Sequence, residues 1–222
     1  MPIVINGSGT VTGISVGGLP DGIVDTDMLA ANAVETAKIA DDAVTSAKAS
    51  LTTGKIGQVV QAVKTDTTDD ISAINSGSND EPAYMTAIAN LQPSITPVAT
   101  SSKILIMYDV CISGNYKYHG ISLWRGSTLL TDAIGAEDGT RSRVMKSYGS
   151  TGALIYTGPF NIAGSFLDSP SSTSSITYKI GAAMHNTSGA GALTKVNQTF
   201  ADDGNYYAPR TISTVTLMEV LA

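Results

Sequence analysis

The stretch Thr211-Ile-Ser-Thr-Val-Thr-Leu-Met-Glu-Val220 decides the fold class, because its apolar residues are interspersed with Thr and Glu. Such alternation is typical of a strand with one face in a core and the other in solvent. Similar stretches recur from residue 57 onward, separated by turns rich in Gly, Ser, Pro and Asp. The expected strands are residues 58–63, 94–98, 103–110, 120–125, 127–130, 154–167, 176–184, 193–200 and 211–220, with a tight turn at Gly126 and a polar loop at 69–83. This pattern predicts an all-β chain that ends in an antiparallel, jelly-roll-like β-sandwich.

Aromatic residues divide the chain into two parts. All nine Tyr, three Phe and the single Trp lie at or after Tyr84. Aromatic side chains fill much of a globular core, so the first third of the chain cannot build an ordinary core alone. We therefore expect an elongated N-terminal region followed by one globular domain over residues 55–222.

Residues 21–50 repeat with a period of ten. The apolar positions of the repeat are Val24, Leu29, Val34, Ile39 and Val44. Their spacing of five residues scatters them around a helix, at about 100° per residue, and alternates them between the faces of a strand. Neither regular element would give this segment an apolar face of its own.

A single copy of this repeat buries too little surface to stay ordered. Burial of one aliphatic side chain contributes about 1.5–3 kcal/mol, whereas ordering ten residues of backbone costs about 10–20 kcal/mol. We therefore expect residues 21–54 to form an intertwined shaft in which three identical chains bury these apolar side chains along a common axis. The alternative is a flexible acidic linker.

Residues 1–20 form a separate Gly-rich, β-prone element. Asn6-Gly7 is a strong two-residue hairpin signal. Because an isolated hairpin is marginally stable in water, we expect this one to gain order by packing on copies of itself or on a partner. The side chains available for such docking are Ile3, Ile5, Val11, Ile14 and Val16.

The composition argues against several classes of function. With 13 basic and 19 acidic residues the net charge is −6, which does not favour binding to nucleic-acid phosphates. Cys111 is the only cysteine, and His119 and His185 have no metal-ligand spacing, so we expect no metal and no cofactor. No run of about 18 apolar residues is present, so no membrane insertion is expected. The chain starts without signal-peptide features, which predicts synthesis in the cytoplasm.

Tail-fibre proteins of marine tailed bacteriophages resemble this chain in its opening, Ile5-Asn-Gly-Ser-Gly-Thr-Val-Thr-Gly-Ile-Ser-Val-Gly-Gly-Leu-Pro-Asp-Gly22, and in the repeats Asn32-Ala-Val-Glu-Thr-Ala-Lys-Ile-Ala40 and Asp42-Ala-Val-Thr-Ser-Ala-Lys48. The C-terminal part is similar to trimeric C1q/TNF-like knobs in Ser94-Ile-Thr-Pro97, Lys103-Ile-Leu-Ile106, Leu123-Trp-Arg-Gly126, Tyr178-Lys-Ile-Gly-Ala182 and Val215-Thr-Leu-Met-Glu-Val220.

The resemblance implies a homotrimeric structural protein of a virion. Residues 1–20 would dock onto the phage tail or an adaptor protein, residues 21–54 would form the shaft, and residues 55–222 would form a knob. The knob would meet a glycan or protein on the host surface, where three equivalent sites raise weak binding through avidity. The alternatives are a capsid-bound head fibre or decoration protein and, from another class, a polysaccharide depolymerase.

Exposed aromatic and Arg side chains on distal loops are the candidates for host contact. They are Tyr116, Tyr118, His119, Arg141, Arg143, Tyr206 and Tyr207. The alternative, which the sequence supports equally, is that the tyrosines line trimer interfaces or strand ends. The acidic pairs Asp69-Asp70, Asp80-Glu81, Glu137-Asp138 and Asp202-Asp203 lie in polar segments. We expect them to be solvated rather than catalytic, so no enzymatic activity is predicted.

Overall fold

The computed structural model describes residues 4–5, 11–12, 39–40, 55–72, 85–114, 118–139, 141–149, 159–185, 193–206 and 208–221. The chain divides into two compact units, Met1–Leu51 and Thr52–Ala222. In the first unit, β1 (Val4–Ile5) pairs with β2 (Val11–Thr12) in antiparallel orientation. Because Ile5 pairs with Val11, the connection spans residues 6–10, which is longer than the two-residue turn that Asn6-Gly7 predicts.

Most residues expected to dock or to line the shaft lie outside the described part. Ile5 and Val11 belong to the two short strands, and Ile39 is exposed in the single chain. The residues outside the described part are Ile3, Ile14, Val16, Val24, Leu29, Val34 and Val44. Docking and the trimeric shaft therefore stay predictions.

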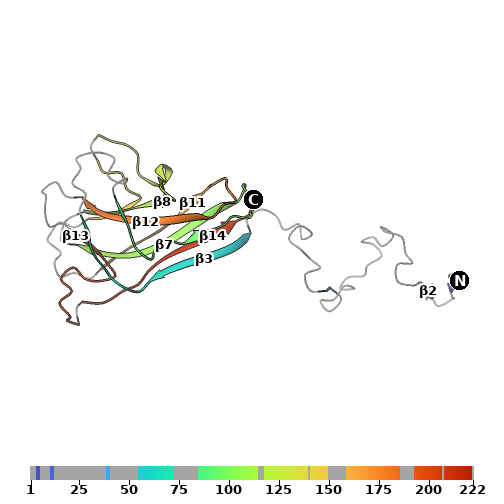
Figure 1. Ribbon diagram of the computed structural model, residues 1–222, viewed down its shortest axis with the longest axis horizontal. Helices are drawn as coiled ribbons and strands as arrows, with labels where there is room; N and C mark the ends of the chain where they lie inside the picture. The colour runs from blue at the N-terminus through green and yellow to red at the C-terminus, as the bar shows by residue number, and fades with distance from the viewer. Residues whose placement is uncertain are drawn as a thin grey trace. The chain divides into compact units, whose positions relative to one another are not determined.

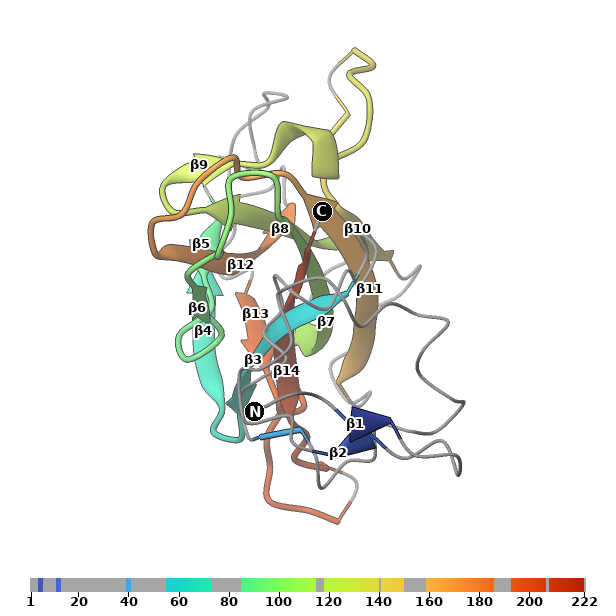
Figure 2. The ribbon, with the colours of Figure 1, turned by 90° about the vertical axis from the view of Figure 1, so that its right-hand side faces the viewer.

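The second unit contains two antiparallel, six-stranded sheets (Figures 1 and 2). Its strands are β3 (Ile56–Lys64), β4 (Thr68–Ser72), β5 (Thr86–Ala87), β6 (Ser94–Ile95), β7 (Lys103–Gly114), β8 (Tyr118–Arg125), β9 (Thr128–Leu129), β10 (Lys146–Gly149), β11 (Phe160–Asp168), β12 (Ile176–His185), β13 (Leu193–Val196) and β14 (Ser213–Val220). Sheet 1 has the order β10–β8–β12–β5, with β9 beside β8 and β6 beside β12. Sheet 2 has the order β3–β14–β7–β13–β4, with β11 also paired to β7.

The inward side chains of both sheets form one hydrophobic core. Sheet 1 contributes Ile121, Leu123 and Ile180, and sheet 2 contributes Ile106 and Leu217, all fully buried. The unit is therefore a sandwich, which confirms the expected all-β class and antiparallel sheets. The described part of the chain contains one helical turn, the 3-10 turn η4 (Thr131–Ala133), and no helix there is long and apolar enough to cross a membrane.

Many strand boundaries differ from the sequence-based expectation, and β5 and β10 were not expected at all. Three of the differences have a clear physical reason. Residues 69–72 were expected in a loop but belong to β4, because Ile71 is buried in the core. β6 ends at Ile95, and Pro97, which has no N–H to donate, follows soon after. β13 ends at Val196, because Asn197 has a left-handed backbone with a φ of 61°. The tight turn at Gly126 is confirmed, with a φ of 60° and β9 paired to β8.

β7 changes its partner along one edge. Its first seven residues pair with β14, and its last three pair with β13. Between the two, the Cys111 N–H donates to Ser213 Oγ at 2.9 Å, and the Cys111 carbonyl accepts from the Asn197 N–H at 3.0 Å. These two contacts keep the β7 edge hydrogen-bonded where no strand lies beside it.

Asn197 completes this junction. Its buried Nδ2 donates to the carbonyls of Lys64 at 2.9 Å and Asp66 at 3.0 Å, and its Oδ1 accepts from Ser213 Oγ at 2.6 Å. Asn tolerates the left-handed conformation better than most residues. One side chain thus joins the end of β3, the start of β14 and the end of β13.

Glu219, on β14, is buried at the opposite end of the sheet. Its Oε2 accepts from Gln58 Nε2 at 2.6 Å, and its Oε1 accepts from the Val98 N–H at 2.7 Å. Burial raises the pKa of Glu219, but the hydrogen bonds outweigh it, so the net pKa lies below the usual 4.5. The carboxylate therefore fastens β3 and the segment before β7 to β14.

The sandwich begins and ends on the same side. The Leu221 N–H donates to the Lys55 carbonyl at 2.8 Å, and Val220 pairs with both Ile56 and Lys103. Figure 1 shows the C-terminus beside the start of β3. The connection between β13 and β14 lies at the other end of the sandwich (Figure 1). Lys55, where the chain enters the unit, and Leu221 thus lie at one end of the sandwich, and the β13–β14 connection lies at the other (Figure 1).

Candidate binding surfaces

The outward face of sheet 2 is largely apolar and open. The registers of β3, β14, β7 and β11 place its side chains in three rows, Val59–Met218–Leu105–Leu167, Gln61–Thr216–Met107–Ser165 and Val63–Thr214–Asp109–Ala163. We refer to these twelve residues as the outer face of sheet 2. Val59, Met107 and Leu167 are between 43 and 54% exposed, and the first two rows contain no ionisable side chain. Exposed apolar side chains gathered on one face make it a candidate interaction surface.

The outward face of sheet 1 is covered by the chain itself. A Cβ added at Gly181 would lie 2.3 Å from the Trp124 ring, and one added at Gly120 would lie 2.7 Å from Val144 Cγ1. Met85 approaches both glycines. The two glycines therefore allow Trp124, Val144 and Met85 to pack against sheet 1, and nothing comparable shields the outer face of sheet 2 within the described residues.

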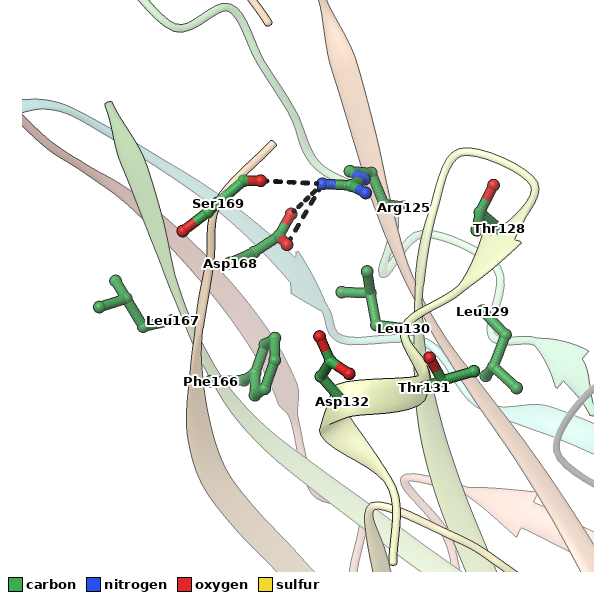
Figure 3. Close-up of a pocket in the computed structure, with 10 residues that line it drawn as sticks. All are labelled: Arg125, Thr128, Leu129, Leu130, Thr131, Asp132, Phe166, Leu167, Asp168 and Ser169. Carbon is green, nitrogen blue, oxygen red and sulfur yellow. Dashed lines mark hydrogen bonds and ion pairs between the residues drawn. The ribbon is translucent and has the colours of Figure 1, made fainter. Parts of the chain in front are cut away.

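A cleft of about 300 Å³ opens between the end of β11 and the β9–η4 segment (Figure 3). Its lining consists of Arg125, Thr128, Leu129, Leu130, Thr131, Asp132, Phe166, Leu167, Asp168 and Ser169. The Asp132 carboxylate lies beside the Phe166 ring in this cleft (Figure 3). A carboxylate that accepts hydrogen bonds and an aromatic ring that provides an apolar surface can hold a small polyhydroxylated group, and the volume is at the lower limit of ligand sites.

Asp168 closes one wall of this cleft by joining the two sheets. Its carboxylate accepts from Tyr178 Oη at 2.6 Å and forms an ion pair with Arg125 Nη1 at 3.1 Å. Asp168 and Tyr178 are both buried. Burial and the bond to Asp168 raise the pKa of Tyr178 well above its usual range, so the phenol stays a neutral donor. Arg125, Asp168 and Tyr178 therefore fasten β8, β11 and β12 together.

The exposed residues expected to contact the host lie on two separate segments. Arg141 is exposed and pairs with Asp138 at 3.2 Å, and Arg143 Nε donates to the Gly135 carbonyl at 2.8 Å, both in the segment after η4. Tyr206, 85% exposed, belongs to the connection between β13 and β14. These segments lie on different sides of the sandwich in both views (Figures 1 and 2). The structure therefore does not bring the three side chains into one site.

His119 is a correction to the predicted contact residues. It is only 3% exposed, and its Nδ1 lies 2.9 Å from Thr194 Oγ1. His119 shares the inward alternation of Ile121 and Leu123 on β8, which places it in the interior, where it bridges the two sheets. A side chain in that position cannot meet a partner.

The remaining predicted contacts are only partly described. The backbone of Tyr118 pairs with Gly149 and His185, whereas Tyr116 and Tyr207 lie outside the described residues.

The acidic pairs are only partly described as well. The described ion pairs join Asp138 to Arg141 and Asp202 to Arg210. Hydrogen bonds from the side chain and from the backbone N–H of Asn205 lower the pKa of Asp203. Within the described part of the chain, no group of three His, Cys, Asp or Glu side chains could hold a metal ion.

Sequence reasoning missed both the outer face of sheet 2 and the Asp168 fastening. The signal for the face is that β3 is apolar on both of its alternating sets, with Val60 and Ala62 on one and Val59 and Val63 on the other. The fastening has no local signal, because Arg125 and Asp168 are far apart in the sequence.

No protein-family model and no curated protein matches the chain. Among solved structures, it is similar to the VP2 subviral particle of infectious bursal disease virus, with a TM-score of 0.37 and 8% identity over 74% of this chain and 32% of that chain. Structures of the Gt and Gx strains of that virus give TM-scores of 0.30 and 0.31, with 11% and 10% identity, over 74% and 75% of this chain and 38% and 37% of theirs. The chain thus spans about a third of their length. Because TM-scores below 0.5 do not establish a common fold, we derive no function from this similarity.

Proposed function

We propose that this chain is a structural virion protein, a homotrimeric fibre that attaches to the phage tail or an adaptor protein through residues 1–20 and contacts a host-surface glycan or protein through its C-terminal unit. The observation that supports this is the hydrogen bond of Leu221 to Lys55, because it places the point where the preceding chain enters at one end of the sandwich, away from the β13–β14 connection (Figure 1). A unit tethered at that end presents its opposite end to whatever the particle approaches. The proposal rests on this tethered arrangement together with the resemblance of the N-terminal repeats to fibre shafts.

The mechanism is adhesion without a chemical step. Three equivalent heads on one shaft make the second and third contacts intramolecular, so weak single sites give strong attachment. Among the predicted contacts whose side chains the structure describes, Arg141 and Tyr206 are the exposed ones. We assign the chain no catalytic activity and no cofactor.

Two measurements test the proposal. Light scattering of the purified full-length chain should give three times the 22.8 kDa chain mass, and the purified protein should compete with virus particles for adsorption to host cells. A monomeric mass would overturn the trimer, and undiminished adsorption at saturating protein would overturn the adhesive function.

The position on the particle has its own test. Gold particles directed to the N-terminus of the chain should label the tail in electron micrographs of intact virions. Label over the capsid would overturn the tail assignment in favour of a head fibre or decoration protein. Release of oligosaccharide from host polysaccharide by the purified protein would overturn the non-enzymatic assignment.

A further inference from the structure

We propose that the cleft between the end of β11 and the β9–η4 segment binds a single neutral sugar ring (Figure 3). The inference goes beyond the proposed function, which places no ligand in this cleft, and it rests on that function only for the source of the sugar, a glycan of the host surface. The site itself lies within one C-terminal unit and requires no second copy of the chain. Its elements are an accessible carboxylate, a fixed guanidinium and an aromatic ring.

The carboxylate of Asp132 is the first element. Asp132 is exposed, and its side chain forms no hydrogen bond or ion pair with any residue that the structure describes. Figure 3 shows this carboxylate in the cleft beside the Phe166 ring. Asp168, in the same cleft, is buried and already accepts from Arg125 and Tyr178. An ionised carboxylate can accept from two adjacent hydroxyl groups at once, which is the arrangement that a sugar ring presents.

The guanidinium of Arg125 is the second element, and its neighbours hold it in place. Its Nη1 donates to the two oxygens of Asp168, at 3.1 and 3.3 Å, and to the carbonyl of Ser169 at 3.4 Å. Its Nε and Nη2 have no partner among the described residues. The side chain is 32% exposed, so these remaining N–H groups can donate to a ligand oxygen. A donor that is fixed before binding loses little freedom when the ligand arrives.

Phe166 gives the cleft its apolar surface. Its ring is half-buried against the core and lines the cleft together with Leu129 and Leu130 (Figure 3). A sugar ring has an apolar side, formed by its C–H groups, and a rim of hydroxyl groups. Because the Phe166 ring lies beside the Asp132 carboxylate, the apolar side can rest on the phenyl ring while the rim meets the carboxylate. An apolar surface with a few placed polar groups is the usual composition of a small-molecule site.

Charge and size select the class of ligand. The lining contains two carboxylates, Asp132 and Asp168, and one guanidinium, Arg125, which gives a net charge of −1. This charge disfavours a uronic acid, a sialic acid or a phosphate group, because like charges repel. A cationic ligand fits poorly as well, since the guanidinium lines the same cleft. The volume of about 300 Å³ is at the lower limit of ligand sites and suits one ring rather than several.

Sugar binding is tested with the full-length protein and free glycosides. The probes are the methyl α-glycosides of glucose, mannose and galactose, with N-acetylneuraminic acid as the anionic comparison. By saturation-transfer NMR and titration, at least one neutral glycoside should bind with a dissociation constant on the order of 1 mM, because so small a ligand gains little affinity. Failure of all three neutral glycosides to bind, or tighter binding of N-acetylneuraminic acid, would overturn the inference.

Substitution of Asp132 tests whether the binding takes place in the cleft. Asp132→Asn keeps the size of the side chain but removes the charge that strengthens its hydrogen bonds, so the affinity for the glycoside should fall about tenfold or more. Asp138→Asn is the matched control, because Asp138 is an exposed acid that follows η4 and does not line the cleft, and it should leave the affinity unchanged. Equal affinities of Asp132→Asn and the unaltered protein would show that the sugar binds elsewhere.

A second variant tests the aromatic contact. Phe166→Leu keeps an apolar side chain but removes the flat ring, so the affinity should fall about threefold or more. Thermal unfolding is measured alongside, because Phe166 packs against the core. A folded Phe166→Leu variant that binds the glycoside as tightly as the unaltered protein would contradict the placement of the sugar on this ring.

The competition experiment with virus particles keeps this inference separate from the proposed function. A protein that competes for host cells but binds none of the neutral glycosides overturns the inference alone. A protein that binds a glycoside through Asp132 but does not compete overturns the adhesive function alone. If the glycoside abolishes competition by the unaltered protein, and Asp132→Asn competes about tenfold less well, the host partner is a glycan held in this cleft.

Discussion

Replacement of Asn197 by Ala tests the junction at which the hydrogen-bonded neighbour of β7 changes from β14 to β13. The substitution removes the three hydrogen bonds of the side chain, to the carbonyls of Lys64 and Asp66 and from the hydroxyl of Ser213. It also leaves a residue with a Cβ at a φ of 61°. The main-chain bonds of residue 197 remain possible, so the variant isolates the side chain and the backbone preference.

The expected loss follows from these contacts. Each buried hydrogen bond contributes about 1 kcal/mol net, so three contribute about 3 kcal/mol. Holding Ala in the left-handed conformation adds about 1 kcal/mol to the loss of stability. A total near 4 kcal/mol corresponds to a fall in melting temperature of about 8–16 °C for a domain of this size.

The assay is thermal unfolding of the full-length protein, followed by circular dichroism at one fixed protein concentration, because association shifts the apparent stability. Asn197→Gly is the matched control, since Gly accepts the positive φ but has no side-chain bonds. It should melt about 2–4 °C above the Ala variant. An Ala variant that melts within about 3 °C of the unaltered protein would refute the role of the side chain, and equal melting of the two variants would refute the backbone part.

Three further substitutions test other parts of the sandwich by the same melting assay. Asp168→Ala leaves the buried hydroxyl of Tyr178 without its acceptor and should cost about 3 kcal/mol, or about 6–12 °C; a change under about 2 °C would contradict the fastening between the sheets. Glu219 has a folded pKa below its unfolded value of 4.5, so its contribution is present above pH 4.5 and is lost as the pH falls through the folded pKa. Glu219→Gln should therefore melt lower at neutral pH and show a shallower decline below pH 4.5 than the unaltered protein, and an identical decline would contradict this assignment. Gly181→Ala should cost about 1–3 kcal/mol by displacing an indole ring, whereas Gly135→Ala, which meets no atom within 4 Å, should change little, so equal effects would contradict the close packing.

The alternation in the last strand predicted the fold class correctly, but it did not predict the burial of every side chain. Val215 and Leu217 point into the core as the pattern indicates, whereas Ile212 is exposed and Glu219 is buried. The strand begins at Ser213, whose hydroxyl is fixed by the junction, and this sets which alternate residues face inward. The partner that stabilises buried Glu219 lies 161 residues away, so no local pattern could reveal it.

Candidate contacts were harder to predict than strands, because residue type says little about direction. His119 lies among tyrosines in a polar segment, which suggested an exposed loop, but the strand extends to include it and turns it inward. The cleft beside Asp168 depends on η4 and on the approach of β11 to β9, both of which follow from packing rather than from any motif. Single-sequence reasoning sees alternation, turns and composition, and it does not see which distant segments meet.

The two units of the chain have the same deficiency for different reasons. The repeats around Ile39 have too few apolar side chains to fold on themselves, whereas the sandwich has an apolar surface that it does not cover, as Val59 and Met107 show. In the proposed homotrimer, a shaft that brings sibling chains into contact would also raise the local concentration of their C-terminal units, which would make any contact between those units intramolecular.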